Sequence, residues 1–290
     1  VLVSAGNNVP SFFRCYYDEL NFTQTTILDI EQDSDGYIWL ATSSGVFRFD
    51  GNEPVPLSDM IPDYRDILDS YIPWIMIADN KLWIGNGYIY DIETGVMEEN
   101  RISKSPTLNK PIIDKLGNIW LNNYDGFAKY DSSNNEMYYL KANVRQGFTF
   151  SDIYVWGINS KSELSRMSIS SGNIINKNIT LPKWVEQDIT LLHAVNDTVI
   201  FIGTKSRGLW LFDVSTTSIR QLFQENYIRN ILTYDPYTYW IATENGIYVY
   251  RLDTDEVVHW EKDPLDSYAI QAHAIYTFFT DRAGGRWGGS

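Results

Sequence analysis

Hydrophobic and polar positions alternate in short runs along the chain, and the runs recur as a unit. The unit is clearest at residues 27–50, where two apolar runs flank a turn at residues 33–36. A second turn at residues 43–45 leads into residues 46–50, in which apolar and polar side chains alternate. Apolar and polar side chains that alternate with a period of two, in runs bounded by Asp, Ser and Gly, predict short β-strands joined by tight turns.

Similar units follow at intervals of about 41 residues, a period typical of propeller blades. Each unit is anchored in its second strand, by Trp39, Trp83, Trp120, Val155, Phe201, Trp240 and Trp287. The copies at Trp83 and Val155 depart most from the pattern, because the first lacks the spaced turn glycine and the second lacks the aromatic anchor. Residues 58–70 are expected to form a long loop between blades. Helical periodicity is nearly absent.

The repeat predicts an all-β protein, a β-propeller of four-stranded antiparallel blades, most simply seven-bladed. Residues 1–290 are expected to form a single β-propeller domain. Residues 1–20 are a lead-in, in which residues 12–17 supply a closing outer strand. The blade anchored at Trp287 is expected to be truncated and to lack its third strand, because the sequence ends at Ser290.

Composition narrows the functional classes. The 290 residues include 23 Lys and Arg against 37 Asp and Glu, a formal net charge of −14. Binding to nucleic acid needs a basic face, and the sequence shows no basic run, so nucleic acid is not expected as a partner. No apolar stretch is long enough to cross a membrane, and residues 1–10 do not resemble a signal peptide. The single cysteine excludes a disulfide within the chain.

Residues 30–51, Ile-Glu-Gln-Asp-Ser-Asp-Gly-Tyr-Ile-Trp-Leu-Ala-Thr-Ser-Ser-Gly-Val-Phe-Arg-Phe-Asp-Gly, resemble the two-component regulator propeller repeat. The chain is similar to the periplasmic sensor region of hybrid two-component system proteins from gut Bacteroidetes. The resemblance implies a ligand-sensing module, located in the periplasm, that responds to glycan-derived oligosaccharides and regulates polysaccharide utilisation genes. It also implies a second propeller, a β-sandwich domain, a membrane helix and a histidine kinase outside this chain, and a homodimer when the protein is intact.

The chain itself is not expected to be an enzyme or to hold a metal or cofactor. Glycoside hydrolysis needs two convergent carboxylates, whereas the turn positions already account for most of the acidic residues, such as Asp33, Asp50 and Asp213. The three histidines are scattered and lack metal-ligand spacing, so structural roles are favoured for His193, His259 and His273.

The loops between the second and third strands vary in sequence, while the turns between the first and second strands are uniform. Variation on a constant scaffold is typical of recognition. Aromatic, amide, carboxylate and guanidinium groups suit a sugar, and Arg adds recognition of carboxylate or sulfate. The predicted ligand-binding residues are Tyr124, Asp125, Lys205, Arg207, Glu244 and Asn245.

Solvated loop residues, or contacts to a second propeller, explain the same side chains equally well. Two further functions stay open. One is a protein-interaction scaffold that uses the same loops. The other, which is less favoured, is a propeller lyase or hydrolase. The sequence does not name the ligand.

Overall fold

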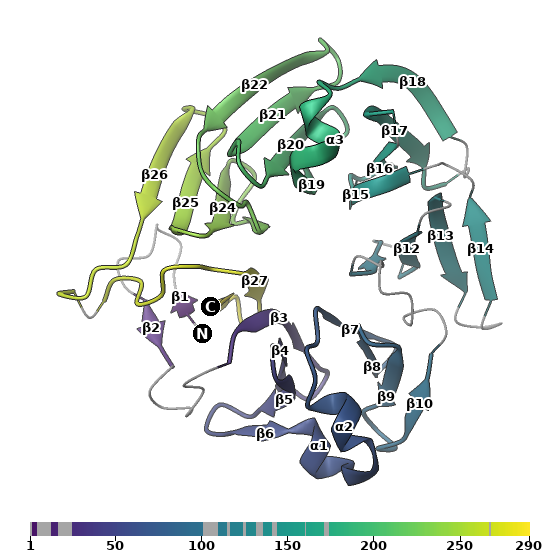
Figure 1. Cartoon of the computed structure of the whole chain (residues 1–290), viewed down its shortest axis with the longest axis vertical. Helices are drawn as coiled ribbons and strands as arrows, with labels where there is room; N and C mark the ends of the chain where they lie inside the picture. Colours follow the sequence, from purple (N-terminus) through teal and green to yellow (C-terminus); the bar gives the residue numbers. More distant parts are fainter. Residues whose placement is uncertain are drawn as a thin grey trace. The chain divides into compact units, whose positions relative to one another are not determined.

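The computed structural model describes residues 2–4, 13–16, 25–100, 110–114, 117–123, 126–131, 136–140, 144–159, 161–170, 174–266 and 268–290. In this part of the chain the strands form seven four-stranded antiparallel sheets (Figure 1). Six of the sheets consist of four consecutive strands, and one combines strands from both ends of the sequence. The all-β propeller fold with four-stranded antiparallel blades is therefore confirmed. The chain divides into two compact units, Val1–Pro106 with Asn230–Ser290, and Thr107–Arg229.

The first unit contains four sheets. Their strands are β3 (Ile27–Gln32), β4 (Ile38–Thr42), β5 (Gly45–Phe49) and β6 (Pro54–Pro56); β7 (Ile75–Ala78), β8 (Lys81–Ile84), β9 (Tyr88–Asp91) and β10 (Met97–Glu99); β23 (Asn230–Thr233), β24 (Thr238–Thr243), β25 (Gly246–Arg251) and β26 (Glu256–Trp260); and β27 (Thr277–Thr280), β28 (Arg286–Gly289), β1 (Leu2–Ser4) and β2 (Arg14–Cys15).

The second unit contains three sheets. Their strands are β11 (Ile112–Ile113), β12 (Ile119–Asn123), β13 (Gly126–Asp131) and β14 (Glu136–Leu140); β15 (Val144–Phe150), β16 (Tyr154–Asn159), β17 (Glu163–Ser168) and β18 (Ile174–Thr180); and β19 (Ile189–Ala194), β20 (Val199–Thr204), β21 (Leu209–Asp213) and β22 (Ser218–Phe223).

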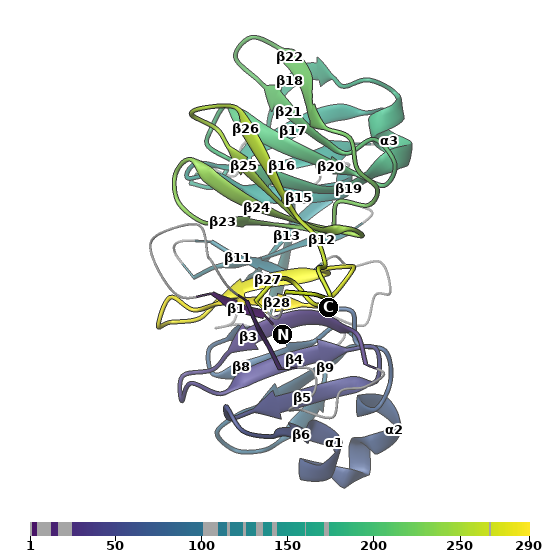
Figure 2. The ribbon, with the colours of Figure 1, turned by 90° about the vertical axis from the view of Figure 1, so that its left-hand side faces the viewer.

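The sheet anchored at Trp287 is complete, so the prediction of a truncated last blade is wrong. Strand β1 pairs with β28, with Val3 opposite Trp287, and β2 pairs with β1 as the outer strand. Strand β27, the other edge of this sheet, lies beside β3 (Figure 2). The expected outer strand near residues 12–17 is confirmed at β2. The third strand was missed because residues 2–4 carry no repeat signature, and their partner lies at the other end of the chain.

Short helices occupy the segment predicted to be a loop at residues 58–70. These are α1 (Leu57–Met60), the 3₁₀ helix η1 (Pro62–Tyr64) and α2 (Arg65–Leu68), and the second unit adds α3 (Trp184–Asp188). Leu57 and Leu68 are fully buried in the hydrophobic cluster that contains Trp39. Helical turns form here because two leucines, rather than a periodic stripe, are drawn into the core.

A hydrogen bond between a turn aspartate and a buried indole recurs in three sheets. The indole N–H of Trp39 donates to Asp33 at 2.7 Å, that of Trp120 to Asp114 at 2.8 Å, and that of Trp287 to Asp281 at 2.8 Å. The other carboxylate oxygen of each aspartate accepts a backbone N–H four residues on. One side chain therefore closes the turn and satisfies a buried donor, which confirms the structural role predicted for Asp33.

The fourth copy of the repeat has its anchor one residue later than predicted. Trp156, not Val155, is the tryptophan whose indole N–H donates to the preceding turn, at 3.3 Å from the Ser151 hydroxyl. Trp156 also pairs across the sheet with Arg166, as Trp39 pairs with Arg48. Serine replaces aspartate in this turn, which removes the motif that would have marked the register.

Candidate functional site

A buried threonine organises the loop after the second strand in three sheets. Thr42 accepts the N–H of Ser44 and donates to the carbonyl of Gly45 at 2.8 Å. Thr243 makes the same two hydrogen bonds, to Asn245 and Gly246. In each case the threonine fixes the base of the loop, so the residues at its tip project from a rigid support.

The loop between β20 and β21 has the same pair of threonine hydrogen bonds and is one residue longer. The hydroxyl of Thr204 accepts the N–H of Arg207 at 3.0 Å and donates to the carbonyl of Gly208 at 2.7 Å. Gly208 has a φ of +70°, and a Cβ placed there would clash with the carbonyl oxygen of Phe223. This position therefore requires glycine, for its conformation and for the close approach of the next strand.

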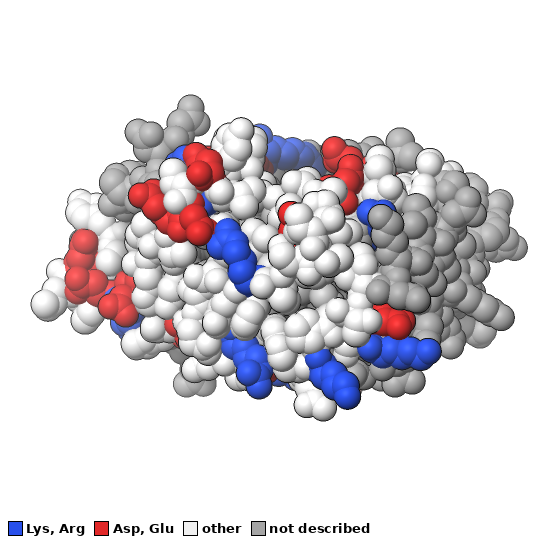
Figure 3. Space-filling model, turned by 90° about the horizontal axis from the view of Figure 1, so that it is seen from above, with Lys and Arg blue, Asp and Glu red and all other residues white. Residues whose placement is uncertain are grey.

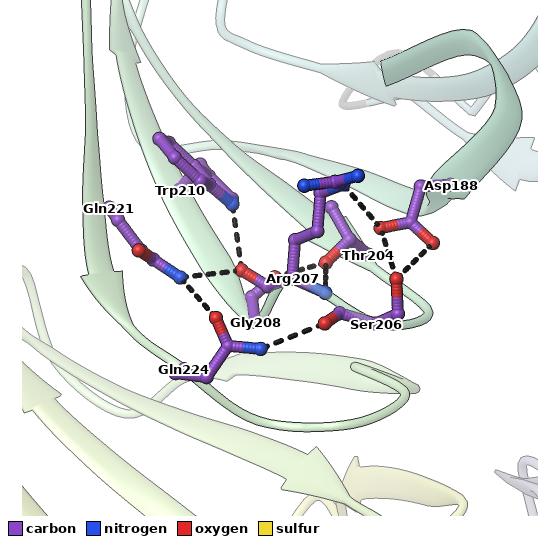
Figure 4. A network of polar contacts seen from close by, with 8 residues as sticks. All are labelled: Asp188, Thr204, Ser206, Arg207, Gly208, Trp210, Gln221 and Gln224. Atoms are coloured by element: carbon purple, nitrogen blue, oxygen red, sulfur yellow. Dashed lines mark hydrogen bonds and ion pairs between the residues drawn. The ribbon is translucent and has the colours of Figure 1, made fainter. Parts of the chain in front are cut away.

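The tip of this loop, which carries the predicted residues Lys205 and Arg207, is held by Asp188 at the end of α3 (Figure 4). The backbone N–H of Lys205 donates to the carbonyl of Asp188 at 2.7 Å, and the Ser206 hydroxyl donates to the carboxylate at 3.0 Å. The guanidinium Nε of Arg207 lies 3.6 Å from the same carboxylate. Asp188 thus holds the backbone of Lys205 and the side chains of Ser206 and Arg207, and Arg207 stays exposed.

Two glutamines of the neighbouring segment complete the network in Figure 4. The amide of Gln221 donates to the carbonyl of Arg207 and to the side-chain oxygen of Gln224, both at 2.8 Å. The amide of Gln224 donates to the carbonyl of Ser206 at 2.8 Å. Both glutamines are exposed, so the surface presents ordered amides beside the guanidinium.

Two half-buried tryptophans form the aromatic part of this surface. The Trp184 and Trp210 ring centroids are 4.8 Å apart, and the indole N–H of Trp210 donates to the carbonyl of Arg207 at 2.8 Å. The Arg207 guanidinium carbon lies 5.6 Å from the centre of the Trp184 ring. We call Trp184, Asp188, Ser206, Arg207, Trp210, Gln221 and Gln224 the Arg207 surface. It combines an aromatic face with charged and amide groups.

The predicted residues Glu244 and Asn245 lie in the loop between β24 and β25 in the first unit. The carbonyl of Asn245 accepts a hydrogen bond from Nε2 of His259, whose ring stacks on Tyr248 with centroids 4.0 Å apart. The other two predicted residues, Tyr124 and Asp125, lie outside the described residues.

The sequence reasoning missed most of the Arg207 surface. Trp210 was assigned to a core strand, and Trp184 lies between the copies of the repeat anchored at Val155 and Phe201. A usable signal existed, because Phe47, Trp210 and Tyr248 each lie two residues after the glycine that ends the loop, and all three are half-buried. An aromatic side chain at this position lies beside the loop that it flanks.

The carboxylates of the outer turns serve the backbone. Hydrogen bonds from the N–H groups of Asn52 and Glu53 lower the pKa of Asp50, and the hydroxyl and N–H of Ser215 lower that of Asp213. Lowered pKa values keep these groups ionised, which is unsuited to a general acid. Burial lowers the pKa of His193 to about 4.

Neither a metal centre nor a membrane helix is found in the described part of the chain. There, no group of three or more His, Cys, Asp and Glu side chains is arranged to hold a metal ion. Among the same residues no helix has the length and hydrophobicity needed to cross a bilayer. On the face shown in Figure 3, white side chains separate the blue Lys and Arg, so no continuous basic patch covers it.

Comparison with known proteins agrees with the propeller assignment and with the repeat. Residues 21–44 match the family model described as "Two component regulator propeller". No match is found among curated proteins. The resemblance to this repeat family is therefore confirmed at the first copy of the repeat.

Solved structures share the fold. The extracellular domain of the putative hybrid two component system BT3049 from B. thetaiotaomicron is 22% identical, with a TM-score of 0.70 over 91% of this chain and 38% of that one. The corresponding domain of BT4673 is 21% identical, with a TM-score of 0.71 over 92% and 37%. This chain thus spans well under half the length of either domain. Virginiamycin B lyase from Staphylococcus aureus is 13% identical, with a TM-score of 0.56 over 91% of this chain and 94% of the lyase.

Proposed function

We propose that this chain is the non-catalytic ligand-sensing propeller of a hybrid two-component system, located in the periplasm and responsive to glycan-derived oligosaccharides. The repeat match and the fold shared with two extracellular sensor domains support this proposal. In it, residues 1–290 form a single seven-bladed propeller. The Arg207 surface is the single structural observation that carries the ligand class.

The chemistry of this surface suits a sugar. Sugar rings pack their C–H faces on aromatic rings, which Trp184 and Trp210 supply. The side-chain oxygen of Gln221 and the second N–H of the Gln224 amide can bond hydroxyl groups. The guanidinium of Arg207 can pair with a carboxylate or sulfate through two parallel hydrogen bonds. Because Asp188 and Thr204 already fix the loop, little conformational entropy is lost on binding.

The intact protein is proposed to contain more than this chain. A second propeller, a β-sandwich domain, a membrane segment and a histidine kinase would complete it, and it would act as a homodimer that controls polysaccharide utilisation genes. Ligand binding would act through different affinities for two arrangements of these parts.

Calorimetric titration of the 290-residue chain with a panel of oligosaccharides tests the proposal. The panel contains neutral maltohexaose and xylohexaose, uronic-acid oligogalacturonides and sulfated chondroitin oligosaccharides. We expect saturable binding of at least one class, with Arg207→Ala reducing the affinity at least tenfold. Failure of every member of the panel to bind would contradict the assignment of this surface.

A lyase is the second candidate function, because virginiamycin B lyase has the same fold over almost its full length. Incubation of the purified chain with the same oligosaccharides and with a streptogramin B substrate separates the two functions. Release of a product would establish the lyase and displace the sensor proposal, whereas binding without any product would support the sensor.

A further inference from the structure

A cavity of about 430 Å³ lies in the second unit, away from the Arg207 surface. Its walls come from the segments just before β12, β16 and β20 and from the end of β17. Asp197, which lines it, precedes β20, whereas Arg207 follows that strand. A strand of this length spans roughly 20 Å, so the two sites are well separated. The volume falls within the range of roughly 300–1,000 Å³ typical of pockets for small organic ligands.

One part of the cavity wall is apolar. Phe150, Ile153 and Ile169 line it together with Ala194 and Val195. Ile153 is 51% exposed, although the other apolar residues of the wall line the same cavity. Covering such side chains with the hydrocarbon part of a ligand would remove apolar surface from water, which favours binding.

The other part of the wall is acidic. Asp114, Asp152 and Asp197 line the cavity, and Lys, Arg and His are absent from the described residues that do so. Asp114 is committed to the turn that holds Trp120. Asp197 is half-buried and receives a long hydrogen bond, 3.4 Å, from the N–H of Ile153. Carboxylates in a concave apolar wall concentrate negative potential, which attracts a cation.

We propose that this cavity binds a small organic cation, with its ammonium group at Asp152 and Asp197 and its hydrocarbon part against Phe150, Ile153 and Ile169. The amphipathic wall favours an amine over a bare metal ion, since a metal would gain nothing from the apolar side. Among the described residues the lining also lacks the cluster of ligands that a metal needs. This inference does not depend on the glycan proposal.

Benzylamine, which is a cation at neutral pH, is the probe for the test, with benzyl alcohol and benzoate as its neutral and anionic counterparts. Titration of the full 290-residue chain, followed by calorimetry and by NMR shifts of backbone amides, should show saturable binding of benzylamine. The affinity of benzyl alcohol should be at least fivefold lower, and benzoate should not bind. The shifted amides should lie in residues 150–153 and 194–197.

Asp197→Asn should weaken benzylamine binding at least fivefold, and Ile153→Ser, at an exposed position, should weaken it about threefold. Asp79→Asn is the matched control, because this exposed turn aspartate of the first unit loses the same charge and does not line the cavity. Equal binding of the amine and the alcohol, or equal effects of Asp197→Asn and Asp79→Asn, would overturn the proposal. So would the absence of saturable benzylamine binding to the unmodified chain.

Discussion

The two ends of the second strand of a sheet carry different kinds of side chain, and the sheet β3–β6 shows both, with Asp33 before β4 and Thr42 at its end. At the turn before the strand, Asp33, Asp114 and Asp281 repeat one arrangement, in which a carboxylate holds a backbone turn and a buried indole. At the loop after the strand, Thr42, Thr204 and Thr243 repeat only the pair of hydrogen bonds at the base, while the tips differ. Before the strand, the need to satisfy a buried indole N–H and the turn N–H groups therefore fixes the side chain. After the strand, only the threonine at the base of the loop is repeated, and the residues at the tip are free to differ.

The turn end should have the largest effect on stability. Asp33→Ala leaves the buried indole N–H of Trp39 without its acceptor and removes the acceptor for two backbone N–H groups. We expect the free energy of unfolding to fall by about 3–4 kcal/mol. Urea denaturation followed by tryptophan fluorescence measures this. The exposed neighbour Asp35 provides the control, because Asp35→Ala should change the free energy of unfolding by less than about 0.5 kcal/mol. Similar losses in both variants would contradict the role of the carboxylate.

The anchor of the sheet β19–β22 is Phe201, which has no indole N–H, and the ring of His193 in β19 stacks on it. Burial lowers the pKa of His193 to about 4 from 6.5, so below pH 6.5 the unfolded chain binds a proton that the folded chain does not. Stability is therefore fully present above pH 6.5 and falls as the pH drops toward 4, by up to about 3 kcal/mol.

Urea denaturation at pH 7.5, 5.5 and 4.5 tests this pH dependence. His193→Gln removes the titrating group, so the loss of stability between pH 7.5 and 4.5 should be smaller in the variant than in the unmodified chain. Parallel pH profiles for the two proteins would show that His193 does not contribute.

The base of the loop should be sensitive to a single methyl group. Gly208→Ala places a Cβ against the carbonyl of Phe223 at a positive φ, whereas Gly284 has a φ of +83° with open space around its Cβ position. We expect Gly208→Ala to cost about 2 kcal/mol more than Gly284→Ala, since both share the backbone strain and only the first adds a steric clash. Thermal unfolding of the two variants separates the backbone strain from the clash. Equal losses of stability would show that strand β22 moves aside to accommodate the added methyl group, which would contradict the expected clash.

The tip of the loop should matter least for stability. Arg207→Ala removes an exposed guanidinium that lies 3.6 Å from Asp188, and such pairs contribute about 1 kcal/mol or less. Urea denaturation should therefore give a change below about 1 kcal/mol. A larger loss would place Arg207 among the structural residues and remove the contrast with the turn end.

Much of the fold could be predicted from the sequence, because the same strands and turns recur. The motif Asp-x-x-Gly-x-x-Trp fixes both the turn and the register wherever it is intact, as at Asp33–Trp39. It failed at Trp156, where serine replaces the aspartate, and at β1, whose strand pairing is with the far end of the chain.

The candidate site was only partly predictable. The loop tips could be located from their variation, and Lys205 and Arg207 lie together on one tip. The partners Asp188, Gln221 and Gln224 could not be assigned, because their contacts depend on how α3 and β22 pack beside the loop. The cavity near Asp197 was not expected, since its lining comes from turns that the sequence explains as structural.

The central claim is that one end of the strand stabilises the fold and the other binds the ligand. Calorimetric titration of the oligosaccharide panel into the unmodified chain, Arg207→Ala and Asp35→Ala tests it most directly. We predict saturable binding to the unmodified chain and to Asp35→Ala, with at least a tenfold loss of affinity in Arg207→Ala. Equal affinity of all three proteins, or no binding to any of them, would contradict the claim.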